Sequence, residues 1–225
     1  MSDRTDGWRA GVRVGLTLSL PTAALGLSFG ATAVGVGWPP LAAIAMSALV
    51  LSGSAQFAFV LALSGGAGPA TGIAAGALMN LRFVPMAAAS ARSLHGGRLQ
   101  RAFEGQTVVD GSWVPAQRGD GTTDRGLMFG ATFVQWPAWI LGTALGALLK
   151  PSAELVHTTG LDVVFPCFFL LLLLDALRSR PDHLWVALTA TAVAGAAVLV
   201  LPAGVALLAA ALAALVTLVP VRRST

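Results

Sequence analysis

The sequence predicts an all-α protein that crosses a membrane several times. Of its 225 residues, 56% are hydrophobic and 11% are charged, and the mean hydropathy is +0.77, well above the range of soluble globular domains. Apolar runs of about 20 residues, the length needed to cross a bilayer, recur along the chain. A helix satisfies its own backbone hydrogen bonds in lipid, so we expect each run to be helical.

Seven candidate membrane segments form a single domain over residues 1–225. They lie near 13–36, 41–63, 71–91, 127–149, 161–177, 184–201 and 203–219, and only Pro202 separates the last two. Residues 92–126 are the one long polar stretch, which we expect to be a cytoplasmic loop. The sequence thus predicts six or seven membrane segments.

Basic residues indicate how many segments cross, because cytoplasmic loops hold most of them. Seven full crossings place nine basic residues on one face and four on the other. If one of the first three segments enters and leaves on the same face, 12 lie on one face and only Lys150 on the other, with Arg82 in the membrane. We prefer this even count, with both termini cytoplasmic; seven crossings stay open because charge in long loops is weaker evidence.

The third segment is the best candidate for a re-entrant or broken element. It begins Gly-Pro-Ala-Thr-Gly, contains Gly76 and Pro85, and carries Asn80 and Arg82 at its centre. Irregular backbone at that depth must line protein or water. A buried guanidinium should face the bundle interior, a cavity or an acidic partner.

The first segment carries Pro21 within its apolar run and several glycines, Gly26 among them. Proline removes a backbone hydrogen bond and kinks or breaks a helix. One interpretation is a bent helix whose glycines permit close packing. The other is a discontinuous helix, in which the backbone near Pro21 and Gly26 contacts a transported molecule.

The second segment contains "LVLSGSAQFAF", in which Ser52, Gly53, Ser54 and Gln56 interrupt the apolar run. A glutamine amide in hydrocarbon needs partners. The serines could simply bond to their own helix. As a cluster beside a glycine, these groups are suited to the ammonium of a zwitterionic ligand. Taking the three segments together, we expect broken elements around Pro21, Gly53 and Asn80.

A ligand carboxylate would suit Arg82, since a guanidinium binds carboxylates bidentately. The possible acidic partners within the protein are Asp110, Asp162 and Asp175. Further along, Trp136 and Trp139 are typical of an aromatic belt at the membrane interface.

Other classes of function fit poorly. The single cysteine and three loop histidines make no metal site, no cofactor motif is present, and "SGSA" has no base for nucleophilic catalysis. The basic residues lie at the ends of apolar segments, where topology explains them without nucleic acid. We therefore expect no enzyme and no cofactor.

Several motifs in order, "PTAALGLSFG", "SGSAQF", "MNLRFVP", "VVDGSW", "WILGTALGA" and "FPCFFLLLL", resemble the AzlC-type family, the large subunit of bacterial branched-chain amino-acid exporters. The resemblance covers nearly the whole chain. Its most specific pieces are the motif from Gly53 to Phe57 and the Asn-x-Arg motif of Asn80 and Arg82. Phe83, Met86 and Gly111 stand where the family usually has histidine, tyrosine and glutamate.

The resemblance implies proton-driven export of valine, leucine, isoleucine or similar amino acids across the inner membrane, together with a small AzlD-type membrane subunit. It also implies that Asp110 is the coupling or gate residue, because Asp110 matches the family's acidic motif. The alternative function is a non-transporting membrane subunit that assembles or regulates a partner protein. Loss of amino-acid flux on substitution of Gln56 or Arg82, at normal abundance, would favour the transporter.

Overall fold

A computed structural model describes residues 2–64, 68–118, 122–160 and 184–201, with isolated residues between 163 and 181 and at 213. The chain forms two compact units, 1–165 and 166–225. Every regular element among the described residues is a helix, as predicted. Most of the predicted segments 161–177 and 203–219, with Asp162 and Asp175, lie outside the described residues.

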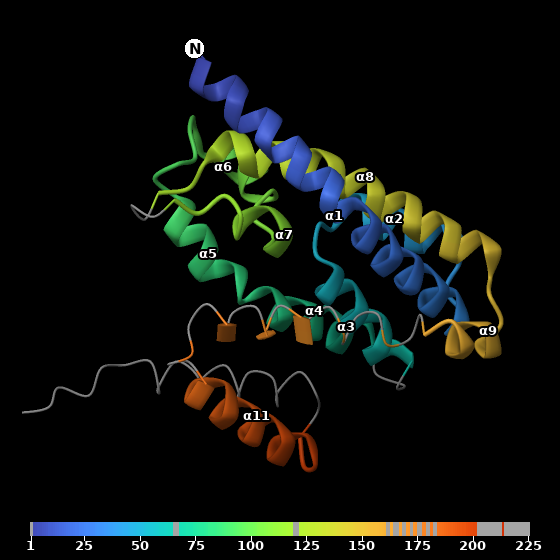
Figure 1. Cartoon of the computed structure of the whole chain (residues 1–225). Helices are drawn as coiled ribbons and strands as arrows, with labels where there is room; N and C mark the ends of the chain where they lie inside the picture. The colour runs from blue at the N-terminus through green and yellow to red at the C-terminus, as the bar shows by residue number, and fades with distance from the viewer. Residues whose placement is uncertain are drawn as a thin grey trace, which may run out of the picture. The chain divides into compact units, whose positions relative to one another are not determined.

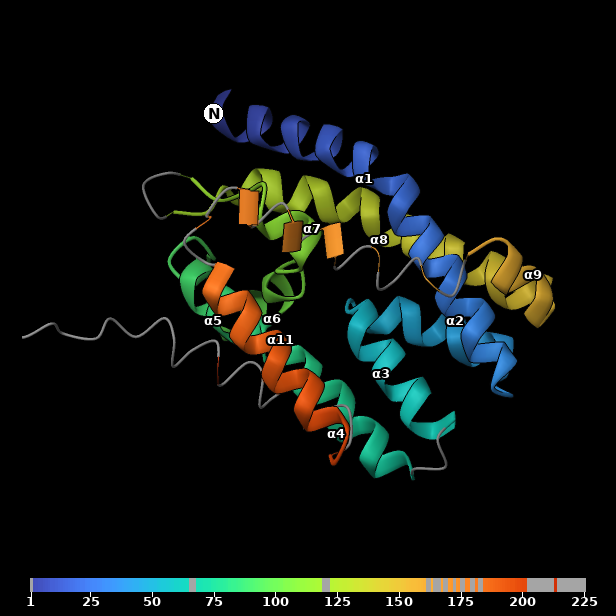
Figure 2. The same ribbon diagram turned by 60° about the horizontal axis from the view of Figure 1, so that its bottom comes forward.

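Two long helices form the spine of the first unit. Helix α1 (Ser2–Gly35) and helix α8 (Arg125–Leu149) are both long and apolar enough to cross a membrane. They pack side by side along most of their length (Figures 1 and 2). A Cβ added at Gly11 would meet Leu127, and one added at Gly30 would meet Thr143. Residue numbers thus rise together along both helices, which are parallel.

Glycines allow the two backbones to approach closely. A Cβ on Gly26 would lie 2.4 Å from the Trp139 carbonyl oxygen, and one on Gly142 would lie 2.1 Å from that of Ala23. Both helices carry the pattern Pro-x3-Leu-Gly-x3-Gly-Ala, beginning at Pro21 and at Pro137. The contacts are therefore reciprocal, and small residues of this kind are what close helix packing in membranes requires.

Helix α1 continues through Pro21, so the predicted break there is wrong. A proline removes one hydrogen bond of the helix, and packing on both sides of it can hold the helix together. The Pro21 side chain is exposed, while Gly15 and Gly26 pack against α8 before and after it. The bent-helix alternative, with glycines for close packing, describes this segment.

The second predicted segment is broken at Gly53, as expected, and it also turns back. Helix α2 (Pro40–Leu49) ends before residues 50–52, and helix α3 (Gly53–Ser64) follows. From the end of α1, α2 runs back along α8 towards its middle, where Ser47 meets Thr143 and Trp139. Helix α3 then returns, since the ring of Phe59 packs on Trp38, which lies just after α1. The pair α2–α3 therefore enters and leaves at the same end of α8.

The third predicted segment is broken, as expected, but does not turn back. Helix α4 (Pro69–Asn80) packs antiparallel to α3, and helix α5 (Phe83–Ser90) continues from it after a bend of 46°. Met86 of α5 packs in a cluster with Met128, near the start of α8. The two helices thus run from one end of α8 to the other. Of the two forms predicted for this segment, re-entrant or broken, the described residues show the break, and the second segment makes the return.

The polar stretch is more than a loop. It contains helix α6 (Arg98–Gly105) and the short helix α7 (Asp110–Trp113). Gln135 Nε2 of α8 donates to the Gly111 carbonyl at 3.2 Å. At 1.5 Å per residue, Gln135 lies about 15 Å into α8 from its start at Arg125. The polar stretch therefore carries Asp110 towards the middle of the bundle.

Parallel packing of α1 and α8 bears on topology. If both cross the membrane, their first residues lie on the same face, and so does the polar stretch before α8. Three full crossings before that stretch would instead make α8 antiparallel to α1. On that condition the helices follow the even-crossing alternative, in which α1 would cross, α2–α3 would turn back, and α4–α5 would cross in return.

Two shorter helices complete the described residues. Helix α9 (Ala153–Thr158) follows α8 in the first unit. In the second unit, helix α11 (Leu184–Val198) covers most of the predicted segment 184–201. Two described helices are long and apolar enough to cross a membrane, or three spans if the bent α4–α5 pair counts as one.

Close packing of the spine predicts that a single added methyl group is harmful. In Gly146→Ala the new Cβ would lie 2.1 Å from the Leu27 carbonyl oxygen. We expect a loss of about 3 kcal/mol, which lowers the melting temperature in detergent by about 10 °C. The control is Gly195→Ala in α11, where nothing lies within 4 Å. Equal melting temperatures for the two variants would contradict the packing.

Topology predicts a labelling pattern. In a Cys167→Ala background, an impermeant thiol reagent added on one face should label Asp6→Cys and Gln106→Cys, both at exposed positions. The same reagent should reach Lys150→Cys, after α8, only from the opposite face. Labelling of the first two variants from opposite faces would rule out the parallel spine.

Candidate functional site

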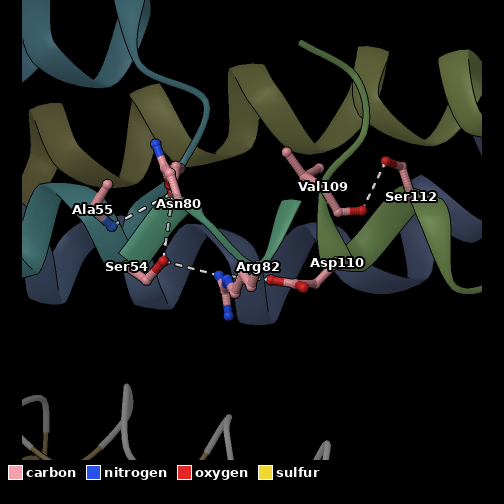
Figure 3. A network of polar contacts seen from close by, with 8 residues as sticks. Ser54, Ala55, Asn80, Arg82, Val109, Asp110 and Ser112 are labelled. Atoms are coloured by element: carbon pink, nitrogen blue, oxygen red, sulfur yellow. Dashed lines mark hydrogen bonds and ion pairs between the residues drawn. The ribbon is translucent and has the colours of Figure 1, made fainter. Parts of the chain in front are cut away.

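Arg82 is the centre of a polar cluster at the break between α4 and α5 (Figure 3). Its Nη2 lies 2.8 Å from Oδ2 of Asp110 and donates to Ser54 Oγ at 2.9 Å. The guanidinium also lies 4.8 Å from the ring centre of Phe83. One charge thus joins the α4–α5 break to the start of α3 and to α7.

A second break meets the first at the same place. Ser52 Oγ, in the α2–α3 break, donates to Asn80 Oδ1 at 2.6 Å and lies 3.4 Å from Ser54 Oγ. It also accepts from the backbone N–H of Ala55 at 3.4 Å, as a helix N-cap does. The cluster therefore places three polar side chains, Ser52, Ser54 and Asn80, around one ion pair.

The ion pair of Arg82 and Asp110 is partly accessible. The side chain of Arg82 is 30% exposed and that of Asp110 is 23% exposed. A guanidinium at membrane depth is stable when it is paired with an opposite charge or reaches water. The guanidinium meets the protein's own carboxylate in this structure, and Asp110 is one of the partners that the sequence offered.

Gln56 belongs to a different network. Its fully buried amide oxygen accepts from Ser47 Oγ at 3.0 Å and from Trp139 Nε1 at 3.2 Å. Its Nε2 donates to the Val50 carbonyl at 2.5 Å, and Ser47 Oγ lies 2.9 Å from Thr143 Oγ1. Val50 caps the end of α2, so Gln56 satisfies a carbonyl that the break leaves without a helical partner. Gln56 holds the break in shape rather than facing Arg82.

The other predicted site residues lie apart from the ion pair. Pro21 is exposed on α1, and Gly26 packs against the backbone of α8. Gly53 lies between the two serines of the cluster, and a Cβ there would be 2.4 Å from the indole ring of Trp139. The structure thus brings together Ser52, Ser54, Asn80, Arg82 and Asp110, while Gly53 supplies the space for the indole.

Sequence reasoning missed the role of Trp139. The expected interfacial belt is wrong for this residue, because its indole N–H donates to Ser47 and Gln56 at the middle of α8. Ser47 and Thr143 were also missed. Thr143 lies one helical turn after Trp139, so both side chains lie on the same face of the helix. That spacing was the sequence signal that the two residues belong to one site.

A buried ion pair attaches the polar stretch that carries Asp110 to the start of α8. Glu104 on α6 is buried and forms a two-bonded ion pair with Arg125 at the start of α8. It also accepts from the backbone N–H of His95 and from Gln100 Nε2, each at 3.1 Å. The hydrogen bond from Arg125 is the main cause that lowers the pKa of Glu104 to about 2. The carboxylate is therefore ionised at neutral pH.

The Glu104–Arg125 ion pair predicts that the stability of the fold depends on pH. Because the pKa of Glu104 is lower in the folded protein than its ordinary value of 4.5, its stabilisation is present above about pH 4.5 and lost as the pH falls towards 2. The melting temperature should be higher for the wild type than for Glu104→Gln at pH 7, and the gap should shrink below about pH 4. A difference in melting temperature that stays constant down to pH 3 would contradict a stabilising Glu104–Arg125 ion pair.

Comparison with known proteins supports one assignment. The family described as AzlC protein matches residues 17–152, more than half of the chain. The match includes the breaks around Ser52 and Arg82, α7, and the whole of α8. No curated protein and no solved structure matches the chain. With the match running from α1 through α8, and with the Arg82 cluster inside it, the chain belongs to the AzlC family.

Proposed function

We propose that the protein is a secondary transporter that exports branched-chain or related hydrophobic amino acids across the inner membrane. The AzlC family is a family of transport proteins in the membrane and is not known for enzymes. The single observation that carries the proposal is the ion pair of Arg82 and Asp110 at the meeting point of two broken helix pairs. Broken helices at the middle of a bundle are where secondary transporters bind their substrates.

The chemistry of the cluster suits an amino acid. A substrate carboxylate that displaces Asp110 would meet the guanidinium of Arg82, which favours planar, two-bonded contacts. The oxygens of Ser52, Ser54 and Asn80 could accept from the substrate ammonium. Apolar side chains of α3 and α4 would surround the substrate side chain. This arrangement selects for a zwitterion with an aliphatic side chain.

Asp110 is proposed as the coupling residue. When a substrate occupies Arg82, the carboxylate of Asp110 loses its partner and can take up a proton. Proton binding and substrate binding then become linked, as export driven by the proton gradient requires. We further propose that a small AzlD-type membrane subunit assembles with the chain and that both termini are cytoplasmic.

Substitution of the guanidinium tests the binding role. In vesicles containing the protein and its small subunit, Arg82→Lys should reduce counterflow of labelled leucine at least about tenfold. Lysine keeps the charge but loses the two-bonded geometry. The control is Arg118→Lys, an exposed arginine of the polar stretch whose ion pair with Asp124 lies outside the cluster. Wild-type counterflow in Arg82→Lys would contradict the proposal. Co-assembly with the small subunit but no flux for the wild type would favour a non-transporting subunit.

Neutralising the carboxylate tests the coupling role. Asp110→Asn should lose uptake driven by a proton gradient while keeping leucine counterflow, because exchange needs no net proton movement. The measurement compares the two assays on the same vesicles, with Asp6→Asn, at an exposed position of α1, as the control. Gradient-driven uptake that is unchanged in Asp110→Asn would remove Asp110 from the coupling step.

A further inference from the structure

The first unit contains two bodies that have separate cores. We define the proximal body as residues 2–20, 83–118 and 122–136, which include α5, α6, α7 and the first parts of α1 and α8. The distal body is residues 22–64, 68–80 and 138–149, which include α2, α3, α4 and the second parts of α1 and α8. The distal core consists of Phe29, Ala33, Ala43, Phe57, Val60 and Ala147, and the proximal core of Val108, Ala116 and Met128. Each core draws all of its members, buried and partly buried, from one body.

Specific contacts follow the same division. The distal body holds the buried network of Ser47, Gln56, Trp139 and Thr143, together with the ring contacts of Phe29 with Phe57 and Trp139. The proximal body holds the Glu104–Arg125 ion pair, the Trp113–Ser90 hydrogen bond, and the Gln135–Gly111 hydrogen bond. Each body is thus internally tied by buried polar groups.

The chain passes between the bodies at three places among the described residues, and each is a point where a helix is weakened. These are Pro21 in α1, the break at residues 81–82 between α4 and α5, and Pro137 in α8. A proline leaves the carbonyl four residues earlier without its helical partner, which makes a helix easier to bend. Both prolines are exposed.

These three places lie at one level of the bundle. Gly15 packs against Ala131 and Gly26 against Trp139 and Thr143, so Pro21 lies level with residues 136–137 of α8. Arg82 contacts Asp110, whose neighbour Gly111 meets Gln135, and also Ser54, whose neighbour Gly53 meets Trp139. Residues 135 and 139 bracket Pro137. The weakened points therefore form one transverse plane.

Arg82 spans that plane. Its hydrogen bond reaches Ser54 of the distal body, and its ion pair reaches Asp110 of the proximal body (Figure 3). The residue itself lies in the break that joins them. A contact that joins two internally rigid bodies across a flexible plane favours one relative orientation.

We propose that the proximal and distal bodies rotate against each other about Pro21, residues 81–82 and Pro137, and that the Arg82–Asp110 ion pair is the latch of this hinge. The proposal rests on the proposed function in one respect: the amino-acid carboxylate is what opens the latch in transport. By taking the place of Asp110 on Arg82, it removes the contact that holds the proximal body. The hinge itself is a property of the fold and needs no substrate to be detected.

Spin labels on exposed positions test the hinge. In a Cys167→Ala background, one label is placed at Leu99→Cys in α6 of the proximal body and one at Leu61→Cys in α3 of the distal body; these side chains are 75% and 55% exposed. The distance distribution is measured by pulsed electron paramagnetic resonance in vesicles without substrate. Adding Asp110→Asn should shift the mean distance between the labels by roughly 5 Å, or add a second population displaced by about that amount. This is the size of a one-turn displacement.

Two controls separate hinge motion from local damage. Labels at Leu99→Cys and Val114→Cys, both in or beside the proximal body's short helices, should keep their distance in Asp110→Asn. Pro21→Ala combined with Pro137→Ala should suppress the shift between the bodies, since both helices regain a hydrogen bond. Pro85→Ala, inside α5, should not suppress it. A distribution unchanged by Asp110→Asn, or a shift that survives the double proline variant, would overturn the hinge.

Addition of leucine separates the hinge from the proposed function. If both are right, leucine shifts the wild-type distribution in the same direction as Asp110→Asn. If Asp110→Asn shifts the distribution and leucine does not, the hinge stands, but leucine is not what opens its latch. If Asp110→Asn causes no shift while leucine is still transported, the hinge is wrong and the proposed function stands.

Discussion

A single guanidinium at the middle of the bundle constrains most of what surrounds it. Arg82 needs an opposite charge at that depth, and the chain supplies it by bringing Asp110 in from the polar stretch. To reach Arg82, that stretch must pack along α8 as far as Gln135, and α4 and α5 must part to expose the guanidinium. The break between α4 and α5 and the inward position of α7 therefore serve one electrostatic requirement.

Rigid and bendable parts of the fold come from the same two helices. Glycines of α1 and α8 bring the two backbones into contact both before and after the prolines. Pro21 and Pro137 weaken the helices between those contacts. The repeated Pro-x3-Leu-Gly-x3-Gly-Ala pattern keeps the prolines level because the helices are parallel. A spine built in this way can hold each half firmly while it permits bending between the halves.

Composition and residue chemistry were enough to predict a helical membrane protein, the breaks at Gly53 and Asn80, and the importance of Arg82. They did not assign the turning segment, because charge counting constrains only how many of the first three segments cross and not which one turns. They also did not place Gln56, since an amide in hydrocarbon has the same need for partners whether these are a ligand or the Val50 carbonyl. The place of Trp139 depended on α2 folding back against α8, and such a long-range contact has no local sequence signal.

The central claim is that Asp110 and a substrate carboxylate compete for Arg82. Leucine affinity measured by calorimetry on the purified protein with its small subunit tests this most directly, because it needs no transport cycle. The account predicts that Asp110→Ala binds leucine at least about tenfold more tightly than the wild type, since the internal competitor is gone, whereas Arg82→Ala does not bind it measurably. Weaker binding by Asp110→Ala than by the wild type would contradict the account, because Asp110 would then be helping to hold the substrate instead of competing with it.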